Sequence, residues 1–183
     1  MTAAGFALFD TAIGCCALGW TEAGIVDVNL PEASPDVTRH RIAGRLAGSR
    51  EQPPPPQVRQ VIERIVALFD GSTNGPKDDL ADVELDLSGV PDFNRAVYRV
   101  TRGIRPGTTL SYGQIATELQ LPGAARAVGR ALGDNPCPII VPCHRVLAAD
   151  GSMHGFSAHG GVAAKRRMLQ LEGALPPDDP TLF

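Results

Sequence analysis

The first thirty residues carry short apolar runs interrupted by glycine-containing turns, a pattern typical of β-strands. Residues 6–30 are broken at Gly14, at Gly19 and at the turn-like Glu22-Ala23-Gly24, which predicts a hairpin or a small antiparallel sheet. Apolar and acidic residues alternate again over 83–87, and this alternation predicts a further strand.

Two helices are predicted between these strands. Residues 39–50 are expected to form a short helix, and the four prolines at 53–56 stop regular structure because proline cannot continue a helix. Residues 57–69 place apolar side chains three and four positions apart, which predicts an amphipathic helix. The apolar face of that helix consists of Val58, Val61, Ile62, Ile65 and Phe69. Together these elements indicate a small α/β domain over residues 1–87.

The second half, residues 88–183, is predicted to be mostly α-helical. An apolar stripe over 93–100 predicts a helix that Arg105-Pro106-Gly107 ends. Its exposed sides are expected to carry Arg95, Arg99 and Arg102. Ser111 and Gln114 have the spacing of a capping box, which predicts that another helix begins there.

The rest of the chain predicts two further helices and one buried strand. Residues 124–132 favour a helix closed by Gly133, and a short helix pair joined by a tight turn resembles a helix-turn-helix. The apolar run Ile139-Ile140-Val141 predicts a buried strand that leads directly into Pro142-Cys143-His144-Arg145. Residues 162–172 predict the last helix, with Gly173 as its cap.

Charge is distributed unevenly, although the net charge of the chain is only -3. Residues 1–90 hold 7 Lys or Arg and 13 Asp or Glu, a balance of -6, whereas residues 91–183 hold 10 and 7, a balance of +3. The net charge therefore argues against a generally basic nucleic-acid binder. The asymmetry indicates that the second half meets an anionic partner, although ordinary surface charge would also account for it.

The N-terminal sequence and the cysteines bear on the compartment. The first residues lack a basic stretch followed by an apolar one, so we expect no secretory signal, a cytoplasmic location and free thiols. No apolar run approaches the roughly 20 residues that span a bilayer. A zinc site that uses Cys15 or Cys16 with His40 is a less favoured alternative to the expectation of no metal.

Cys143 has a setting that favours reactivity. Most isolated cysteines are small buried hydrophobes, but Cys143 follows an apolar run and a proline, and precedes a histidine and an arginine. A free thiol is mostly protonated at neutral pH, so a nucleophilic cysteine needs a base or a cation. His144 is the candidate base, either directly through a tight turn or through a bridging water. Glu172 is a candidate to orient His144 from the last helix, its alternative being a solvated acid.

The stretch 111–146 carries a resemblance to a known family. Its segments Ser-Tyr, Ala-Arg-Ala-Val-Gly, Asn-Pro and Pro-Cys-His-Arg-Val occur in the order and spacing of the O6-alkylguanine-DNA alkyltransferases. The similarity extends over residues 88–173, and the first half fits the family's ribonuclease H-like α/β domain in outline. The resemblance implies DNA repair without a cofactor. One alkyl group passes irreversibly from O6-alkylguanine to Cys143, and O4-alkylthymine is a second candidate substrate.

The resemblance also implies roles for individual residues. Base flipping would bring the lesion to the cysteine, because a stacked base cannot be reached. The second helix of the pair would enter the minor groove with small Ala125 and Ala127, and Arg126 would fill the gap in the duplex. Tyr112 would donate to the purine and Asn135 would tie the helix to the active-site turn. The plainer alternative for Arg126 is a phosphate contact or an exposed helix charge. For Tyr112 it is a core tyrosine, and for Asn135 an ordinary turn residue.

The expected substrate pocket contains Val146, Phe156, Ser157 and Lys165, the lysine being equally typical of a helix surface. The carbonyls of Cys143 and Val146 would accept from the guanine amino group. The expected partner is double-stranded DNA that contains alkylated guanine. The protein is expected to act as a monomer and not to bind a membrane.

Three features depart from the family pattern. Phe156 replaces a common tyrosine, and Ala158-His159 separates Ser157 from the glycine pair that usually follows directly. We expect this two-residue insertion, with the titratable His154 and His159 nearby, to alter the size or alkyl preference of the pocket. Arg130 stands where small residues are common and is expected to add a phosphate contact.

Three other functions compete with alkyl transfer. An alkyltransferase-like protein would bind the lesion without removing the alkyl group, but such relatives usually lack the cysteine. A cysteine hydrolase would have no reason to carry Arg126 on a helix-turn-helix-like pair. A transcriptional regulator would be expected to carry a second DNA-binding module. Cys143 and Arg126 together therefore favour the transferase.

Overall fold

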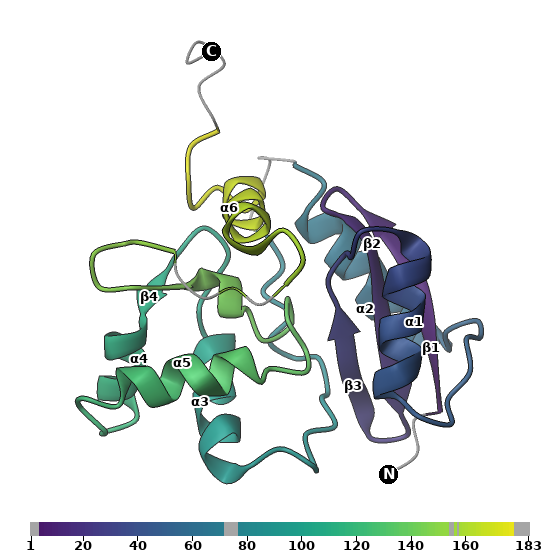
Figure 1. Ribbon diagram of the computed structural model, residues 1–183, viewed down its shortest axis with the longest axis horizontal. Helices are drawn as coiled ribbons and strands as arrows, with labels where there is room; N and C mark the ends of the chain where they lie inside the picture. The colour runs from purple at the N-terminus through teal and green to yellow at the C-terminus, as the bar shows by residue number, and fades with distance from the viewer. Residues whose placement is uncertain (1–3, 72–76, 154–155, 157, 178–183) are drawn as a thin grey trace.

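The protein is described from a computed structural model, over residues 4–71, 77–153, 156 and 158–177. It has mixed α/β architecture (Figure 1). The strands are β1 (Gly5–Thr11), β2 (Gly14–Thr21), β3 (Gly24–Asn29), β4 (Leu110–Ser111) and β5 (Val146–Leu147). The helices are α1 (Pro35–Arg45), α2 (Pro56–Leu68), α3 (Asp92–Arg102), α4 (Tyr112–Glu118), α5 (Ala125–Gly133), the 3-10 turn η1 (Cys143–Arg145) and α6 (Gly161–Leu171). Within these residues, none of the helices is long and apolar enough to cross a membrane.

The antiparallel sheet predicted for residues 6–30 is confirmed as a three-stranded meander in the order β1-β2-β3. Both of its faces are covered, which explains why β2 is apolar at consecutive positions rather than at alternate ones. Phe6 and Ala17 pack against Ile42 of α1, whereas Leu18 lies in the cluster that contains Ile65 of α2. α1 therefore covers one face of the sheet and α2 the other, and β3 is the strand nearest the second half of the molecule (Figure 1).

The predicted helices at 57–69, 93–100, 124–132 and 162–172 are confirmed to within a few residues by α2, α3, α5 and α6. The capping box is also confirmed: Gln114 N donates to Ser111 Oγ at 3.1 Å and Ser111 N donates to Gln114 Oε1 at 2.7 Å. These reciprocal bonds satisfy two donors that a helix start leaves free. They fix the start of α4 and, with it, the position of Tyr112.

Two element predictions in the first half are wrong. The helix expected at 39–50 is α1 over Pro35–Arg45, because Ser34 caps it from the N-terminal side and Gly48 adopts a φ of +87° beyond its end. The strand expected at 83–87 is only a bridge between Leu85 and Ile25. A hydrogen bond of 2.9 Å from Ile25 N to Glu84 O supports that bridge, but no longer ladder forms.

Two predictions in the second half are also wrong. Ile139-Ile140-Val141 is buried as expected, yet it forms a turn in which Ile139 has a φ of +77°. Arg102 is half-buried instead of exposed, and its Nη2 donates to the carbonyls of Leu80, Ala81 and Val83. This arginine holds the connecting segment against α3.

The two halves share one hydrophobic core and are joined by backbone contacts. Val28 N at the end of the sheet donates to Pro136 O at 2.8 Å. Buried Cys137 places its sulfur 3.9 Å from Ile25 O. The main apolar cluster includes Leu18 and Val28 as well as Val128 and Ile140. This junction sets β3 and α1 beside the segment that precedes Cys143.

Candidate active site around Cys143

Cys143 is presented by a tight turn whose shape depends on Asn135. Asn135 Nδ2 donates to Val141 O at 2.9 Å, and Asn135 Oδ1 accepts from Cys137 N at 2.9 Å. Cys143 N then donates to Val141 O at 2.7 Å, and the 3-10 turn η1 begins at Cys143. The buried amide therefore ties the end of α5 to the turn that carries the thiol, through the kind of hydrogen bonds expected from the sequence.

A buried charged network lies directly beneath this turn. His144 Nε2 lies 2.9 Å from Glu172 Oε1. Arg145 Nε and Nη2 each donate to the same carboxylate at 2.8 Å, and Arg145 Nη1 donates to Ile104 O. All three charged or titratable side chains are 0% exposed. The structure thus brings Glu172 to His144, and the solvated alternative for Glu172 is wrong.

Arg145 is part of this network, although no role was predicted for it beyond its place in the motif. The signal that could have indicated its burial is an arginine within an otherwise apolar segment, because a buried guanidinium requires an acid elsewhere in the chain. Its partner comes from the end of α6, 27 residues away.

The network fixes the protonation state of His144. Burial alone would raise the pKa of Glu172, but His144 and Arg145 outweigh it and lower that pKa to about 2. Burial lowers the pKa of His144, against the opposing effect of Glu172, so the imidazole is neutral at neutral pH. An ionised carboxylate only accepts hydrogen bonds, hence the proton of the neutral ring lies on Nε2. His144 Nδ1 is then a basic atom, and it is buried without a partner.

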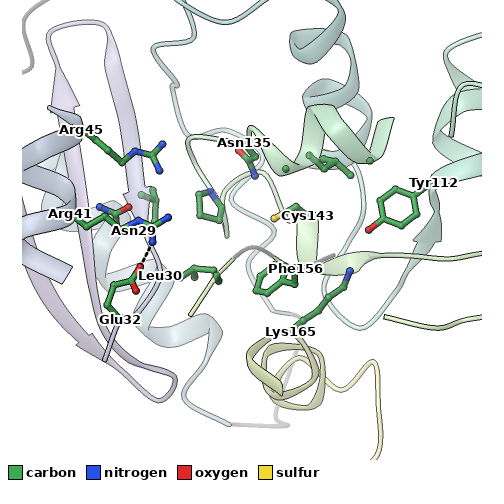
Figure 2. A pocket seen from close by; sticks show the side chains of 16 residues that line it. Asn29, Leu30, Glu32, Arg41, Arg45, Tyr112, Asn135, Cys143, Phe156 and Lys165 are labelled. Carbon is green, nitrogen blue, oxygen red and sulfur yellow. Dashed lines mark hydrogen bonds and ion pairs between the residues drawn. The ribbon is translucent and has the colours of Figure 1, made fainter. Parts of the chain in front are cut away.

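The thiol of Cys143 faces a pocket and is neutral at rest. Burial raises its pKa, while Asn135 and Lys165 act in the opposite direction. Cys143 lines the pocket together with Tyr112 and Phe156, and in Figure 2 it lies between Tyr112 and the N-terminal elements. A neutral thiol beside a neutral base forms a pair that can ionise when an electrophile arrives.

Lys165 is buried at the aromatic end of the pocket, so its alternative as a helix-surface lysine is wrong. It is 1% exposed, and its Nζ donates to Val146 O at 2.6 Å. The ammonium lies 5.9 Å from the Tyr112 ring centroid and 5.8 Å from that of Phe156. Burial lowers its pKa, whereas Cys143 acts to raise it. Lys165 thus supplies a cation close to the thiol.

The other predicted site residues occupy three places. Arg126 and Arg130 of α5 are exposed, and Ala125 and Ala127 are half-buried on the same helix. Ala158 of the insertion lines the pocket, whereas His159 lines a neighbouring hollow with Glu32 and Met168. The predicted residues Ser157 and His154 lie outside the described part of the chain.

The zinc alternative gains no support. Cys16 is buried in the core, and His40 Nδ1 lies 2.7 Å from Asp36 O in the first turns of α1. Over the ranges that the structure describes, His, Cys, Asp and Glu side chains do not form a group of three or more that could hold a metal.

Sequence reasoning missed one wall of the pocket. It is formed by five residues of β3, α1 and the segment between them, namely Asn29, Leu30, Glu32, Arg41 and Arg45. Figure 2 shows these side chains on the side of Cys143 opposite Tyr112 and Lys165. More than 95 residues separate them from Cys143 in the sequence, so no local motif could have indicated the contact.

Comparison with known proteins identifies the family of the chain. Residues 92–174 match the model of the 6-O-methylguanine DNA methyltransferase DNA binding domain. The chain is 44% identical over 131 residues to the methylated-DNA--protein-cysteine methyltransferase of Mycobacterium tuberculosis H37Rv, covering 72% of this chain and 74% of the relative. It is 42% identical over 124 residues to the protein of that name from Salmonella typhimurium, covering 62% of this chain and 69% of the relative.

Solved structures give the same result over nearly the whole chain. Mycobacterium tuberculosis OGT in complex with DNA superposes with a TM-score of 0.72 at 34% identity, covering 93% of each chain. The O6-methylguanine-DNA methyltransferase of Pyrococcus kodakaraensis shares the fold, with a TM-score of 0.68 at 24% identity over 92% of this chain and 99% of that one. The chain therefore belongs to the family of methylated-DNA--protein-cysteine methyltransferases.

Proposed function

We propose that Cys143 is the residue that receives the alkyl group when this DNA-repair methyltransferase acts on O6-alkylguanine, with O4-alkylthymine as a second substrate. The thiolate sulfur attacks the alkyl carbon, a carbon–sulfur bond forms and the bond to O6 breaks. The electron pair leaves with the guanine, which is then protonated. Because the product is a thioether, each molecule reacts once.

The observation that carries the proposal is the free Nδ1 of His144, the residue that follows Cys143 in the turn. Glu172 holds the other ring nitrogen at 2.9 Å, so the basic atom cannot exchange roles with it. A water molecule that bridges Nδ1 and the thiol would pass the proton of Cys143 to the imidazole. Glu172 would stabilise the imidazolium that forms, in the manner of a Cys–base–acid relay, and Arg145 would hold that carboxylate in place.

The aromatic end of the pocket is proposed to hold the flipped base. Tyr112 would donate to the purine ring as negative charge develops on the leaving guanine. The buried Lys165 ammonium would stabilise the thiolate during the attack. Phe156 and Val146 would form the walls around the base. The carbonyls of Cys143 and Val146 would accept from its amino group. A carbonyl oxygen has two lone pairs, so Val146 O could do so beside Lys165.

DNA binding is proposed for α4 and α5 acting as a helix-turn-helix. The exposed Arg126 and the small Ala125 and Ala127 support insertion of α5 into the minor groove, with Arg126 in the gap left by the extruded base. Exposed Arg130 would add a phosphate contact. Residues 88–183 would then be the alkyltransferase domain and residues 1–87 a ribonuclease H-like domain beside it. We further infer a cytoplasmic monomer.

Mass spectrometry of the peptide that contains Cys143 tests the proposal. After incubation with duplex DNA containing O6-methylguanine, this peptide should gain the mass of one methylene group, and Cys143→Ala should gain none. Modification of a different residue would contradict the assignment. If the protein binds the lesion but stays unmodified, the alternative of an alkyltransferase-like lesion binder is correct.

A further inference from the structure

The Cys143 pocket has a polar end that methyl transfer does not use. Four charged residues line the whole pocket: Glu32, Arg41, Arg45 and Lys165. Three of them are cations. Two of these cations, Arg41 and Arg45, belong to the wall formed by β3, α1 and the segment between them. A methyl group needs neither charge nor hydrogen bonds, so these groups suit a larger substituent.

Hydrogen-bond donors outnumber acceptors on this wall. Arg41 Nη1 donates to Glu32 Oε1 at 2.5 Å, and Arg45 Nε donates to Asp27 Oδ2 at 2.8 Å. Each guanidinium has five N–H groups in all, so most of them remain available. Asn29 Nδ2 is an additional buried donor without a partner, on a residue that is 3% exposed. Buried donors are rarely left unpaired, so Asn29 Nδ2 and the remaining guanidinium N–H groups can take a further acceptor from a ligand.

The position of the wall relative to the thiol indicates what the acceptor would be. Tyr112 and Lys165 lie on one side of Cys143, whereas Asn29, Arg41 and Arg45 lie on the other (Figure 2). A base held at the aromatic end would direct its O6 substituent past the sulfur toward the N-terminal elements. The distal end of a long substituent would therefore meet the two arginines.

We infer that Asn29, Arg41 and Arg45 form a subsite for a carboxylate at the end of the alkyl group, so that the protein discriminates in favour of carboxyalkyl adducts of guanine. This inference rests on the proposed acceptor role of Cys143. The reaction is otherwise unchanged: the sulfur bonds to the methylene carbon attached to O6, that carbon–oxygen bond breaks, and the carboxylate is retained in the thioether. Glu32 competes with the substrate for Arg41.

The test compares transfer rates for adducts of equal size and different polarity. DNA duplexes would carry O6-carboxymethylguanine or O6-isobutylguanine, and in a longer pair O6-(3-carboxypropyl)guanine or O6-(4-methylpentyl)guanine. For each pair, the transfer rate of the carboxyalkyl adduct is divided by the rate of the alkyl adduct. Dividing this ratio in a variant by the same ratio in the wild type removes the intrinsic reactivity of each adduct. We expect Asn29→Leu and Arg41→Leu each to lower this ratio about tenfold in at least one pair, the usual effect of losing a hydrogen bond to a charged group.

Two further variants separate this subsite from general damage. Glu32→Gln frees Arg41 and should raise the carboxylate preference. Arg39→Leu should not change it, because Arg39 lies on the same helix and pairs with Asp36 and Glu51 rather than lining the pocket. Ratios that stay unchanged in Asn29→Leu, Arg41→Leu and Glu32→Gln would overturn the inference. Failure of the wild type to transfer methyl would instead overturn the proposed function.

Discussion

The Glu172 carboxylate is the group whose replacement best tests how the active site is held together. It accepts hydrogen bonds from His144 at 2.9 Å and from two nitrogens of Arg145 at 2.8 Å, and all of these side chains are buried. Glu172→Gln preserves the shape of the side chain but replaces one oxygen by an NH2 group. That group would face N–H donors, and the buried guanidinium would lose its counter-charge.

The expected effect is large because a buried ion pair is being broken rather than replaced. Removing one partner of such a pair costs about 3–5 kcal/mol, against a total stability of about 5–15 kcal/mol for a typical domain. Urea unfolding at neutral pH should show the free energy of unfolding of Glu172→Gln lowered by about 3–5 kcal/mol. Glu118→Gln, at an exposed position of α4, should change it by less than about 0.5 kcal/mol.

The contribution of Glu172 to stability should also depend on pH, in a direction that its pKa shift determines. The folded pKa of Glu172 is lowered from 4.5 to about 2. Its contribution to stability is therefore present above the unfolded pKa and is lost as the pH falls from 4.5 toward about 2. The difference between wild type and Glu172→Gln should persist at neutral pH and shrink in that acid range. A loss below about 1 kcal/mol at neutral pH would refute the reasoning, since the charge of Arg145 would then be balanced by a group other than Glu172.

Three further predictions concern stability, DNA binding and the pocket. Burial raises the folded pKa of Asp27 to about 6, so its contribution to stability is lost as the pH rises from about 4 to about 6. Urea unfolding should show Asp27→Asn gaining about 2–3 kcal/mol relative to wild type across that range, and a constant difference would contradict this. Arg126→Ala should weaken DNA binding and reduce the slope of log affinity against log salt by about 0.9. Arg59→Ala, on exposed α2 surface, is the control, and equal slopes would contradict a phosphate or groove contact. Deleting Ala158 and His159 should shorten the loop over the pocket and lower benzyl transfer about tenfold relative to methyl; unchanged relative rates would exclude a role for the insertion.

Local interactions account for the elements that the sequence predicted well. The Ser111–Gln114 capping box acts within four residues, and the predicted start of α4 is confirmed. The apolar face of α2 is likewise a matter of spacing within one helix, and Val58, Val61 and Ile65 are buried as expected. Where one segment contains the whole cause of its structure, the pattern of the sequence is enough to predict it.

Longer-range interactions decided the features that the sequence did not predict. The apolarity of Ile139-Ile140-Val141 indicated burial correctly, but it could not indicate a turn whose backbone groups are satisfied by the amide of Asn135. The alternating residues around Leu85 do not form a strand. Pairing with β3 is confined to a single bridge, between Leu85 and Ile25. The polar wall at Asn29 and Arg41 depends on the junction between the two halves, which no single segment specifies.

Burial shifts the pKa values of Cys143 and His144 in opposite directions, and both shifts favour the uncharged form of the side chain. It raises the pKa of the thiol and lowers that of the imidazole, so the resting site contains a thiol and a base rather than a thiolate and an imidazolium. Thiolates are the oxidisable form of cysteine, and a protein whose acceptor is used once loses its function if that sulfur is oxidised. On the proposed mechanism, charge separation occurs only when an alkyl carbon is present, and Lys165 and Glu172 then stabilise the thiolate and the imidazolium respectively. On this mechanism, burial of the thiol would limit its oxidation before the reaction, and Lys165 and Glu172 would assist charge separation during it.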